Sequence, residues 1–238
     1  MPCTQYKWKI RRLKYKNNNI KIAPSLFAAN FANLSHDISI VEKEGAQFLH
    51  LDVMDGMFVP NLSIGPQILK NIRPISKMVF DAHLMIMEPR RFIDDFIAAG
   101  ADYITIHFES TDKVEETIDY INECGIKSGI AIKPKTSIKS IEHFIKKVSM
   151  VLIMSVEPGF GGQSFISESL KRIAKTRKLI EKLNPTCELE VDGGINLDNL
   201  TDVVESGATV IVAGSSIFET PDIAQTLKNF KDKCNKIQ

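Results

Sequence analysis

The fold is decided by residues 48–61, which read Phe-Leu-His-Leu-Asp-Val-Met-Asp-Gly-Met-Phe-Val-Pro-Asn. Polar or sulfur-bearing side chains alternate here with aliphatic ones: His50, Asp52 and Met54 against Leu49, Leu51 and Val53. Because successive side chains of a β-strand point to opposite faces, a strand here has one apolar face and one chemically active face. The Asp-Gly pair at 55–56 then opens a loop, so the active face lies just before the C-terminal end of a strand. Parallel α/β folds place their chemistry at that end.

Glycine junctions recur along the chain between a helix-like and a strand-like stretch, at Gly45, Gly100, Gly125 and Gly207. A glycine there is typical of a helix C-terminal cap, which requires a left-handed backbone. The glycines are separated by 55, 25 and 82 residues, close to multiples of about 27, the size of one strand-plus-helix unit. Regular alternation of this kind predicts a parallel sheet.

Eight expected strands alternate with eight expected helices. The strands are 21–26, 47–54, 78–85, 102–108, 127–132, 150–155, 187–192 and 209–214; the helices lie near 35–44, 65–73, 89–99, 112–124, 137–147, 167–183, 197–206 and 221–231. This pattern predicts a closed (β/α)8 TIM barrel, a single α/β domain over residues 20–232, with a basic N-terminal extension (1–19) and a C-terminal tail (233–238). A doubly wound open sheet is the alternative. No Gly-x-Gly-x-x-Gly motif follows the first strand, which counts against a dinucleotide-binding fold.

One face of the expected strands is repeatedly polar. The side chains on it are His50, Asp52, Asp81, His83, Thr105, His107, Glu188, Glu190 and Asp192. An open sheet covered by helices usually has two apolar faces. The polar face therefore favours a barrel interior that leads to a site.

The composition is that of a globular domain with a sizeable core, since 44% of the 238 residues are hydrophobic and 25% are charged. A formal net charge of +1 gives no general electrostatic reason to expect a nucleic acid or a membrane as partner. Four scattered cysteines suit a reducing compartment, and no apolar run is long enough to span a bilayer. We expect a cytoplasmic location, with organelle targeting by the basic residues of 1–19 as the alternative.

His50, Asp52, His83 and Asp192 form a candidate metal site, because each lies at or near the C-terminal end of an expected strand. Two imidazoles and two carboxylates suit one borderline divalent ion, which can be Zn²⁺, Fe²⁺, Mn²⁺ or Co²⁺. The alternative for each histidine is a hydrogen-bonded core residue. His107 fits that structural role better than a place among the ligands.

Asp52 and Asp192 also suit an acid–base pair. Removing a proton next to a ketone requires a base, and returning it on the opposite face requires an acid. Two carboxylates from opposite sides of a barrel can take these parts, with the metal stabilising the enediolate oxygens. The alternative is that both are ligands only. Asp55, on the following loop, is expected to form a turn.

Glycine-rich loops follow the last three expected strands, at residues 157–163, 192–196 and 213–216. Glycines allow backbone N–H groups to converge on an anion, and barrels commonly bind phosphate after strands seven and eight. The loops predict a phosphorylated substrate, with Ser215 as a hydroxyl donor to the phosphate. Ser25 is a candidate hydrogen-bond partner of a substrate hydroxyl, or alternatively a turn serine. Three methionines at strand ends form a candidate water-excluding collar, or alternatively fill the core: Met54, Met85 and Met154.

Five segments together resemble the ribulose-phosphate 3-epimerase family, and they follow the same order along residues 20–230. They are 22–26 (IAPSL), 50–61 (HLDVMDGMFVPN), 81–85 (DAHLM), 155–163 (SVEPGFGGQ) and 191–195 (VDGGI). The segment at 50–61 is highly diagnostic. The resemblance implies a barrel that interconverts D-ribulose 5-phosphate and D-xylulose 5-phosphate in the pentose phosphate pathway.

The resemblance also implies roles for single residues. The metal ligands are His50, Asp52, His83 and Asp192, and the two aspartates are the acid–base pair. Substrate contacts fall on Ser25, His83, Gly159, Phe160, Gly161, Gly162, Asp192, Gly193, Gly194, Gly214 and Ser215. A homo-oligomer, dimer or larger, is expected on the same ground. Two other functions stay open, namely epimerisation of a hexulose 6-phosphate and non-catalytic sensing of a sugar phosphate.

Overall fold

The eight strands form one parallel sheet in the order β1-β8-β7-β6-β5-β4-β3-β2. They are β1 (Lys21–Pro24), β2 (Phe48–Met54), β3 (Val79–Met85), β4 (Tyr103–His107), β5 (Lys127–Ile132), β6 (Met150–Met154), β7 (Glu188–Asp192) and β8 (Val210–Ala213). A parallel bridge between Ser25 and His50 joins the two ends of the sheet, which confirms the predicted barrel. This computed structural model describes residues 20–237. The basic segment 1–19, for which organelle targeting was the alternative prediction, lies outside the described residues.

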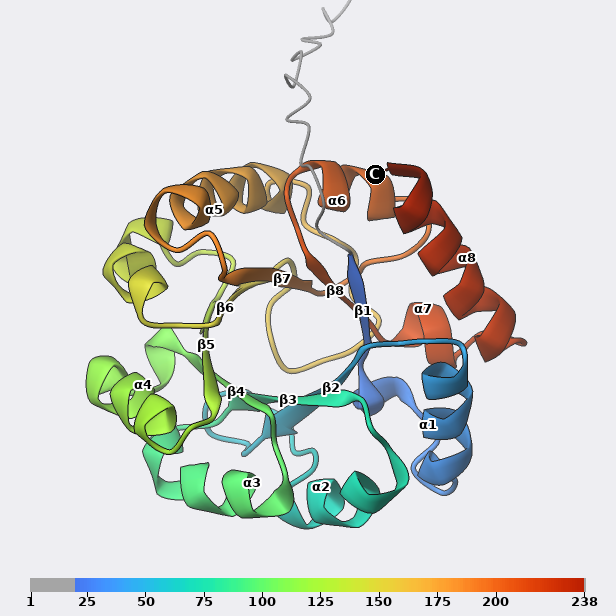
Figure 1. The fold of residues 1–238 in the computed structure, drawn as a ribbon, viewed down its shortest axis with the longest axis horizontal. Coiled ribbons are helices and arrows are strands. Elements are labelled where there is room, and N and C mark those ends of the chain that lie inside the picture. Colours follow the sequence, from blue (N-terminus) through green and yellow to red (C-terminus); the bar gives the residue numbers. More distant parts are fainter. Residues whose placement is uncertain (1–19, 238) are drawn as a thin grey trace, which may run out of the picture.

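Helices surround the ring of strands (Figure 1). The α-helices are α1 (Leu34–Lys43), α2 (Pro66–Ile72), α3 (Ile93–Ala99), α4 (Val114–Glu123), α5 (Ser169–Leu183), α6 (Leu200–Glu205), α7 (Ser215–Phe218) and α8 (Ile223–Ile237). Shorter 3₁₀ helices are η1 (Leu26–Ala28), η2 (Arg73–Ile75), η3 (Pro89–Phe92) and η4 (Phe108–Ser110), and a longer one is η5 (Ile138–Lys146). The four junction glycines all have positive φ, between 78° and 111°, as predicted for helix caps.

Three helical segments differ from the sequence-based expectation. The expected helix 137–147 is the 3₁₀ helix η5, because Ile138, Ile141 and Phe144 recur every three residues, the repeat of a 3₁₀ turn. Helix α8 continues to Ile237, so residues 233–237 are its last turns and not a separate tail. The four-residue helix α7 was not predicted, because it is too short to show a periodic pattern.

The packing of β2 explains how one strand serves both core and site. Its aliphatic residues Leu49, Leu51 and Val53 are buried in the large cluster between strands and helices. Its opposite face lines the barrel interior, where Phe48 joins an apolar cluster with Tyr103. The polar side chains therefore lie between this cluster and the C-terminal opening of the barrel. None of the helices among residues 20–237 has both the length and the apolar character that crossing a membrane requires.

Candidate active site

The four predicted metal ligands converge at the C-terminal end of the barrel. His50 and Asp52 come from β2, His83 from β3 and Asp192 from the last position of β7. One nitrogen or oxygen atom of each lies within 4.8 Å of the corresponding atoms of the others. The register of the sheet places Asp52 beside His83 across β2 and β3. The structure thus brings together the residues that the sequence singled out.

Hydrogen bonds fix the orientation of His50. Its Nδ1 lies 2.8 Å from Oδ2 of Asp81, whose other oxygen accepts a hydrogen bond of 2.9 Å from the Thr105 hydroxyl. Its Nε2 points to the site, 3.4 Å from Oδ1 of Asp52 and 3.2 Å from Nδ1 of His83. A carboxylate that orients a ring nitrogen in this way is typical of metal-binding histidines. Asp81 was predicted to face inward, and the structure gives it this orienting contact.

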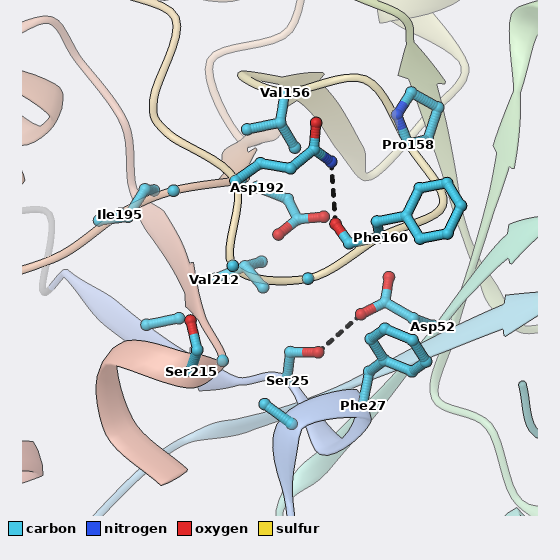
Figure 2. Close-up of a pocket in the computed structure, with 18 of the residues that line it drawn as sticks. Ser25, Phe27, Asp52, Val156, Pro158, Phe160, Asp192, Ile195, Val212 and Ser215 are labelled. Atoms are coloured by element: carbon cyan, nitrogen blue, oxygen red, sulfur yellow. Dashed lines mark hydrogen bonds between the residues drawn. The ribbon is translucent and has the colours of Figure 1, made fainter. Parts of the chain in front are cut away.

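The two aspartates differ in their affinity for a proton. Asp52 accepts a hydrogen bond of 2.6 Å from the Ser25 hydroxyl. Burial opposes its ionisation, but the charge of His50 and the hydrogen bond from it outweigh burial and hold the pKa of Asp52 well below its usual value. Burial and the negative charge of Asp52 together raise the pKa of Asp192 to about 6. Both carboxyl groups face the same pocket (Figure 2).

Burial shifts the pKa of two further groups near these ligands toward the neutral form. Glu190 has no hydrogen-bond partner among the described residues, and burial together with the nearby Asp81 carboxylate raises its pKa far above the usual range. Burial lowers the pKa of His107 to about 4. Burial thus disfavours the charged form of both side chains.

The pocket over the aspartates is lined by most of the predicted substrate contacts. These are Ser25, Gly159, Phe160, Gly161, Gly162, Asp192, Gly193, Gly194, Gly214 and Ser215, together with the three methionines Met54, Met85 and Met154. His83, which was predicted to contact substrate, is fully buried and does not belong to this lining. Among the described residues that line the pocket, none is a lysine or an arginine.

Two residues that the sequence did not single out hold the loops around the pocket. The Asn61 side chain donates a hydrogen bond of 2.8 Å to the carbonyl oxygen of Gly159. The Ser155 hydroxyl lies 2.8 Å from the carbonyl oxygen of Asp192 and 2.7 Å from that of Gly193. Only their positions in the sequence could have pointed to these residues, since Asn61 is the last residue of the segment 50–61 and Ser155 directly follows β6.

Asp55 forms the turn that was predicted for it. Its Oδ1 accepts hydrogen bonds of 2.8 and 2.9 Å from the backbone N–H groups of Met57 and Phe58. Its Oδ2 accepts one of 2.8 Å from the N–H group of Met87 on the loop after β3. These contacts occupy the carboxylate and tie the β2 loop to its neighbour.

The chain matches known proteins over most of its length. Residues 21–218 match the Ribulose-phosphate 3 epimerase family. Over 220 residues the chain is 42% identical to the chloroplastic ribulose-5-phosphate-3-epimerase of Arabidopsis thaliana, covering 92% of this chain and 78% of that protein. Over 213 residues it is 42% identical to ribulose-phosphate 3-epimerase of Bacillus subtilis, covering 89% and 98%.

A solved structure of 3-keto-L-gulonate-6-phosphate decarboxylase from Vibrio cholerae shares the fold alone. Its TM-score is 0.70 at 12% identity, over 93% of this chain and 100% of that one. The sequence matches are much closer, and they extend over nearly the whole barrel. By these matches, the chain belongs to the ribulose-phosphate 3-epimerase family.

Proposed function

We propose that this chain interconverts D-ribulose 5-phosphate and D-xylulose 5-phosphate by moving the C3 proton from one face of the substrate to the other. One observation carries the proposal: Asp52 and Asp192, from strands β2 and β7, direct carboxyl groups of different proton affinity into one pocket. Pairs of carboxyl groups whose pKa values are pushed apart are typical of acid–base catalysis. The curated relatives described above carry this activity in their names.

The two aspartates divide the chemistry between them. Ionised Asp52 takes the proton from C3, and the electron pair of the broken C–H bond moves toward the C2 carbonyl to give an enediolate. Asp192, in the protonated form that its raised pKa of about 6 favours, then donates its proton to the opposite face of C3, which forms the new C–H bond and restores the ketone. Before the next turnover in the same direction, Asp52 releases its proton to solvent and Asp192 takes one up. The reverse reaction uses the same groups with their roles exchanged.

We propose that one divalent ion, Zn²⁺, Fe²⁺, Mn²⁺ or Co²⁺, is held by His50, Asp52, His83 and Asp192. The residues fit such an ion, because two imidazole nitrogens and two carboxylate oxygens lie within 4.8 Å of one another. When bound, the ion supplies positive charge beside the substrate oxygens that become negative.

The loops around the pocket suit the rest of the substrate. Backbone groups of Gly159–Gly162, Gly193, Gly194 and Gly214 and the hydroxyl of Ser215 are proposed to hold the phosphate. Ser25 is proposed to accept a hydrogen bond from a substrate hydroxyl while its own hydroxyl donates to Asp52. The three methionines of the lining are proposed to exclude water from the enediolate. Assembly into a homo-oligomer stays a prediction from the family resemblance.

An assay of the purified chain tests the reaction and the ion together. We expect turnover of D-ribulose 5-phosphate, loss of activity after chelation, and recovery when one of the four ions is added back. Matched assays with hexulose 6-phosphates serve as the control for substrate class. Turnover of the hexulose phosphates alone would replace the pentulose assignment, and binding without turnover would indicate a sensor.

The ion is expected to bind with a pH dependence to which Asp192 contributes. A carboxyl group must lose its proton to become a ligand. The pKa of Asp192 is raised to about 6, so the group is protonated at about pH 5 and ionised at about pH 7.5. Calorimetry in buffers of different ionisation enthalpy should therefore detect, at the lower pH, about one more released proton per bound ion in the wild type than in Asp192→Asn, since the histidine ligands release their protons in both proteins. Equal proton release by the two proteins at the lower pH would contradict the assignment.

A further inference from the structure

A chain of buried side chains leads from the proposed metal site toward the surface through His83, His107 and Glu109. Nδ1 of His83 lies 3.0 Å from Oδ1 of Asp52, and its Nε2 lies 2.8 Å from Nε2 of His107. Nδ1 of His107 lies 3.3 Å from Oε2 of Glu109. Both imidazoles are fully buried, whereas the Glu109 side chain is 21% exposed. The proposed reaction gives neither His107 nor Glu109 a part.

Glu109 is an acceptor held firmly in place. Its Oε1 accepts hydrogen bonds from the Thr136 hydroxyl and from the backbone N–H of Lys133. Burial alone would raise the pKa of Glu109, but hydrogen bonds from His107, Thr136 and Lys133 outweigh burial and lower it to about 2. The side chain is thus a carboxylate, which can only accept hydrogen bonds.

The carboxylate determines where the protons of the chain lie. A neutral imidazole has one N–H donor and one acceptor nitrogen. Because Glu109 only accepts, Nδ1 of His107 carries the proton and its Nε2 is an acceptor. Nε2 of His83 must then carry the proton that joins the two rings. In the neutral form of His83, Nδ1 then has a lone pair that faces Asp52.

Two hydrogen-bond acceptors, His83 Nδ1 and the Asp52 carboxylate, face each other at a distance that requires a proton or a cation between or beside them. The lone pair of His83 Nδ1 and the Asp52 carboxylate lie 3.0 Å apart, with Nε2 of His50 3.2 Å from the first and 3.4 Å from the second. Without an ion, a proton on Nε2 of His50 or on Nδ1 of His83 can fill this place. With an ion, all three groups can turn a lone pair toward it.

We propose that His107 and Glu109 are positioning residues that fix the tautomer of His83 and so keep its Nδ1 available to a divalent ion. His50 obtains the same constraint from Asp81 directly, whereas His83 obtains it through a second ring. This inference rests on the proposed metal site. The test separates the positioning role of His107 and Glu109 from the metal site itself, because the tautomer of His83 is measured without an ion.

The main variant is His107→Phe, which keeps a ring against Phe58, whose ring centroid lies 4.8 Å from that of His107. It removes the acceptor for His83 Nε2. We expect ion affinity to fall by about 10–100-fold, as for other partners of metal-binding histidines, and kcat to fall with little change in KM, because the phosphate loops are untouched. His107→Gln restores an acceptor oxygen and should therefore bind the ion more tightly than His107→Phe. For the same reason, Glu109→Gln should bind it more tightly than Glu109→Ala.

Two measurements other than activity decide the question on the full chain. Competition with a chromophoric chelator gives the Zn²⁺ affinity, and nitrogen-15 NMR of labelled histidine gives the tautomer in ion-free protein. We expect His83 to carry its proton on Nε2 in the wild type and to lose this single tautomer in His107→Phe. Thr136→Val is a graded comparison, because it removes one hydrogen bond to Glu109 but leaves Oε2 free to accept from His107; it should lose much less affinity than Glu109→Ala.

Unchanged affinity and an unchanged His83 tautomer in His107→Phe or in Glu109→Ala would overturn the proposal. If His107→Phe does not fold, the ion affinity and the His83 tautomer are compared between His107→Gln and Glu109→Ala instead, and the same outcome overturns the proposal. A wild-type chain that binds no divalent ion would remove the proposed metal site, and the NMR spectra would still show whether Glu109 fixes the two rings.

Discussion

Asp192→Asn is expected to lower kcat for interconversion by about 10²–10⁴-fold, the usual contribution of a positioned acid or base. Asparagine has nearly the same shape as aspartate and keeps an oxygen for an ion, but it cannot carry the transferred proton. Asp52 remains ionised in this variant, because the charge of His50 is the largest of the effects that lower its pKa against the opposing effect of burial. One half of the reaction should therefore survive when the other is lost.

Exchange of the C3 proton with deuterated water resolves the two halves. The epimer whose C3 proton faces Asp52 should still exchange in Asp192→Asn, because Asp52 removes the proton and returns deuterium to the same face. The other epimer should not exchange. Asp52→Asn should give the mirror-image pattern, so the two variants together assign each aspartate to one face of the substrate.

A surface substitution of the same kind provides the control. Asp198 is exposed outside the pocket lining, and Asp198→Asn should behave as the wild type. Metal content measured on each variant separates loss of proton transfer from loss of the ion. Exchange of both epimers at the wild-type rate in Asp192→Asn would rule out the two-base scheme.

The barrel and the ligand cluster could be predicted because both follow from regular repeats in the sequence: the alternation of strands and helices, and the two-residue alternation of side chains within a strand. Alternation along residues 48–54 fixed which side chains of β2 face inward, and the burial of Leu49 and Leu51 in the outer core confirms it. Four chemically distinctive residues at strand ends then had to meet, since all parallel strands of a barrel end at the same rim.

The remaining features depend on contacts that no local pattern encodes. The link between His83 and His107 depends on the stagger of β3 and β4, which pairs His83 with Thr105 and leaves His107 farther along. The bond from Asn61 to Gly159 joins loops that are 98 residues apart in sequence. The burial of His83 beneath the pocket lining also depends on side-chain depth, which the order of strands does not reveal.

Gly194→Ala is expected to damage both stability and substrate binding, because the backbone there leaves no room for a side chain. Gly194 has a φ of +67°, and an added Cβ would lie 2.5 Å from the Phe165 nitrogen and 2.6 Å from the Gln163 oxygen. Both neighbours are backbone atoms, so rotating a side chain cannot relieve the clash. The segment 163–165, which follows the glycine-rich loop of the pocket, must move instead.

Gly125→Ala separates this clash from the cost of the backbone conformation. Gly125 has a similar φ of +78° but no atom within 4 Å of an added Cβ. A left-handed alanine costs about 1–2 kcal/mol in either place, and overpacking at Gly194 should add about 1–3 kcal/mol. Denaturant unfolding should show that difference in the free energy of unfolding between the two variants.

The kinetic contrast between the two glycine variants should be larger still. A displacement of about 1 Å in a positioning segment can cost about 10²-fold in rate, so kcat/KM of Gly194→Ala should fall by about that factor, chiefly through KM. Gly125→Ala should keep the wild-type kcat/KM, because its helix cap lies away from the pocket lining. Equal stability and equal KM in the two variants would show that the loops after β6 and β7 do not depend on this close backbone contact, and the phosphate site proposed there would lose its structural basis.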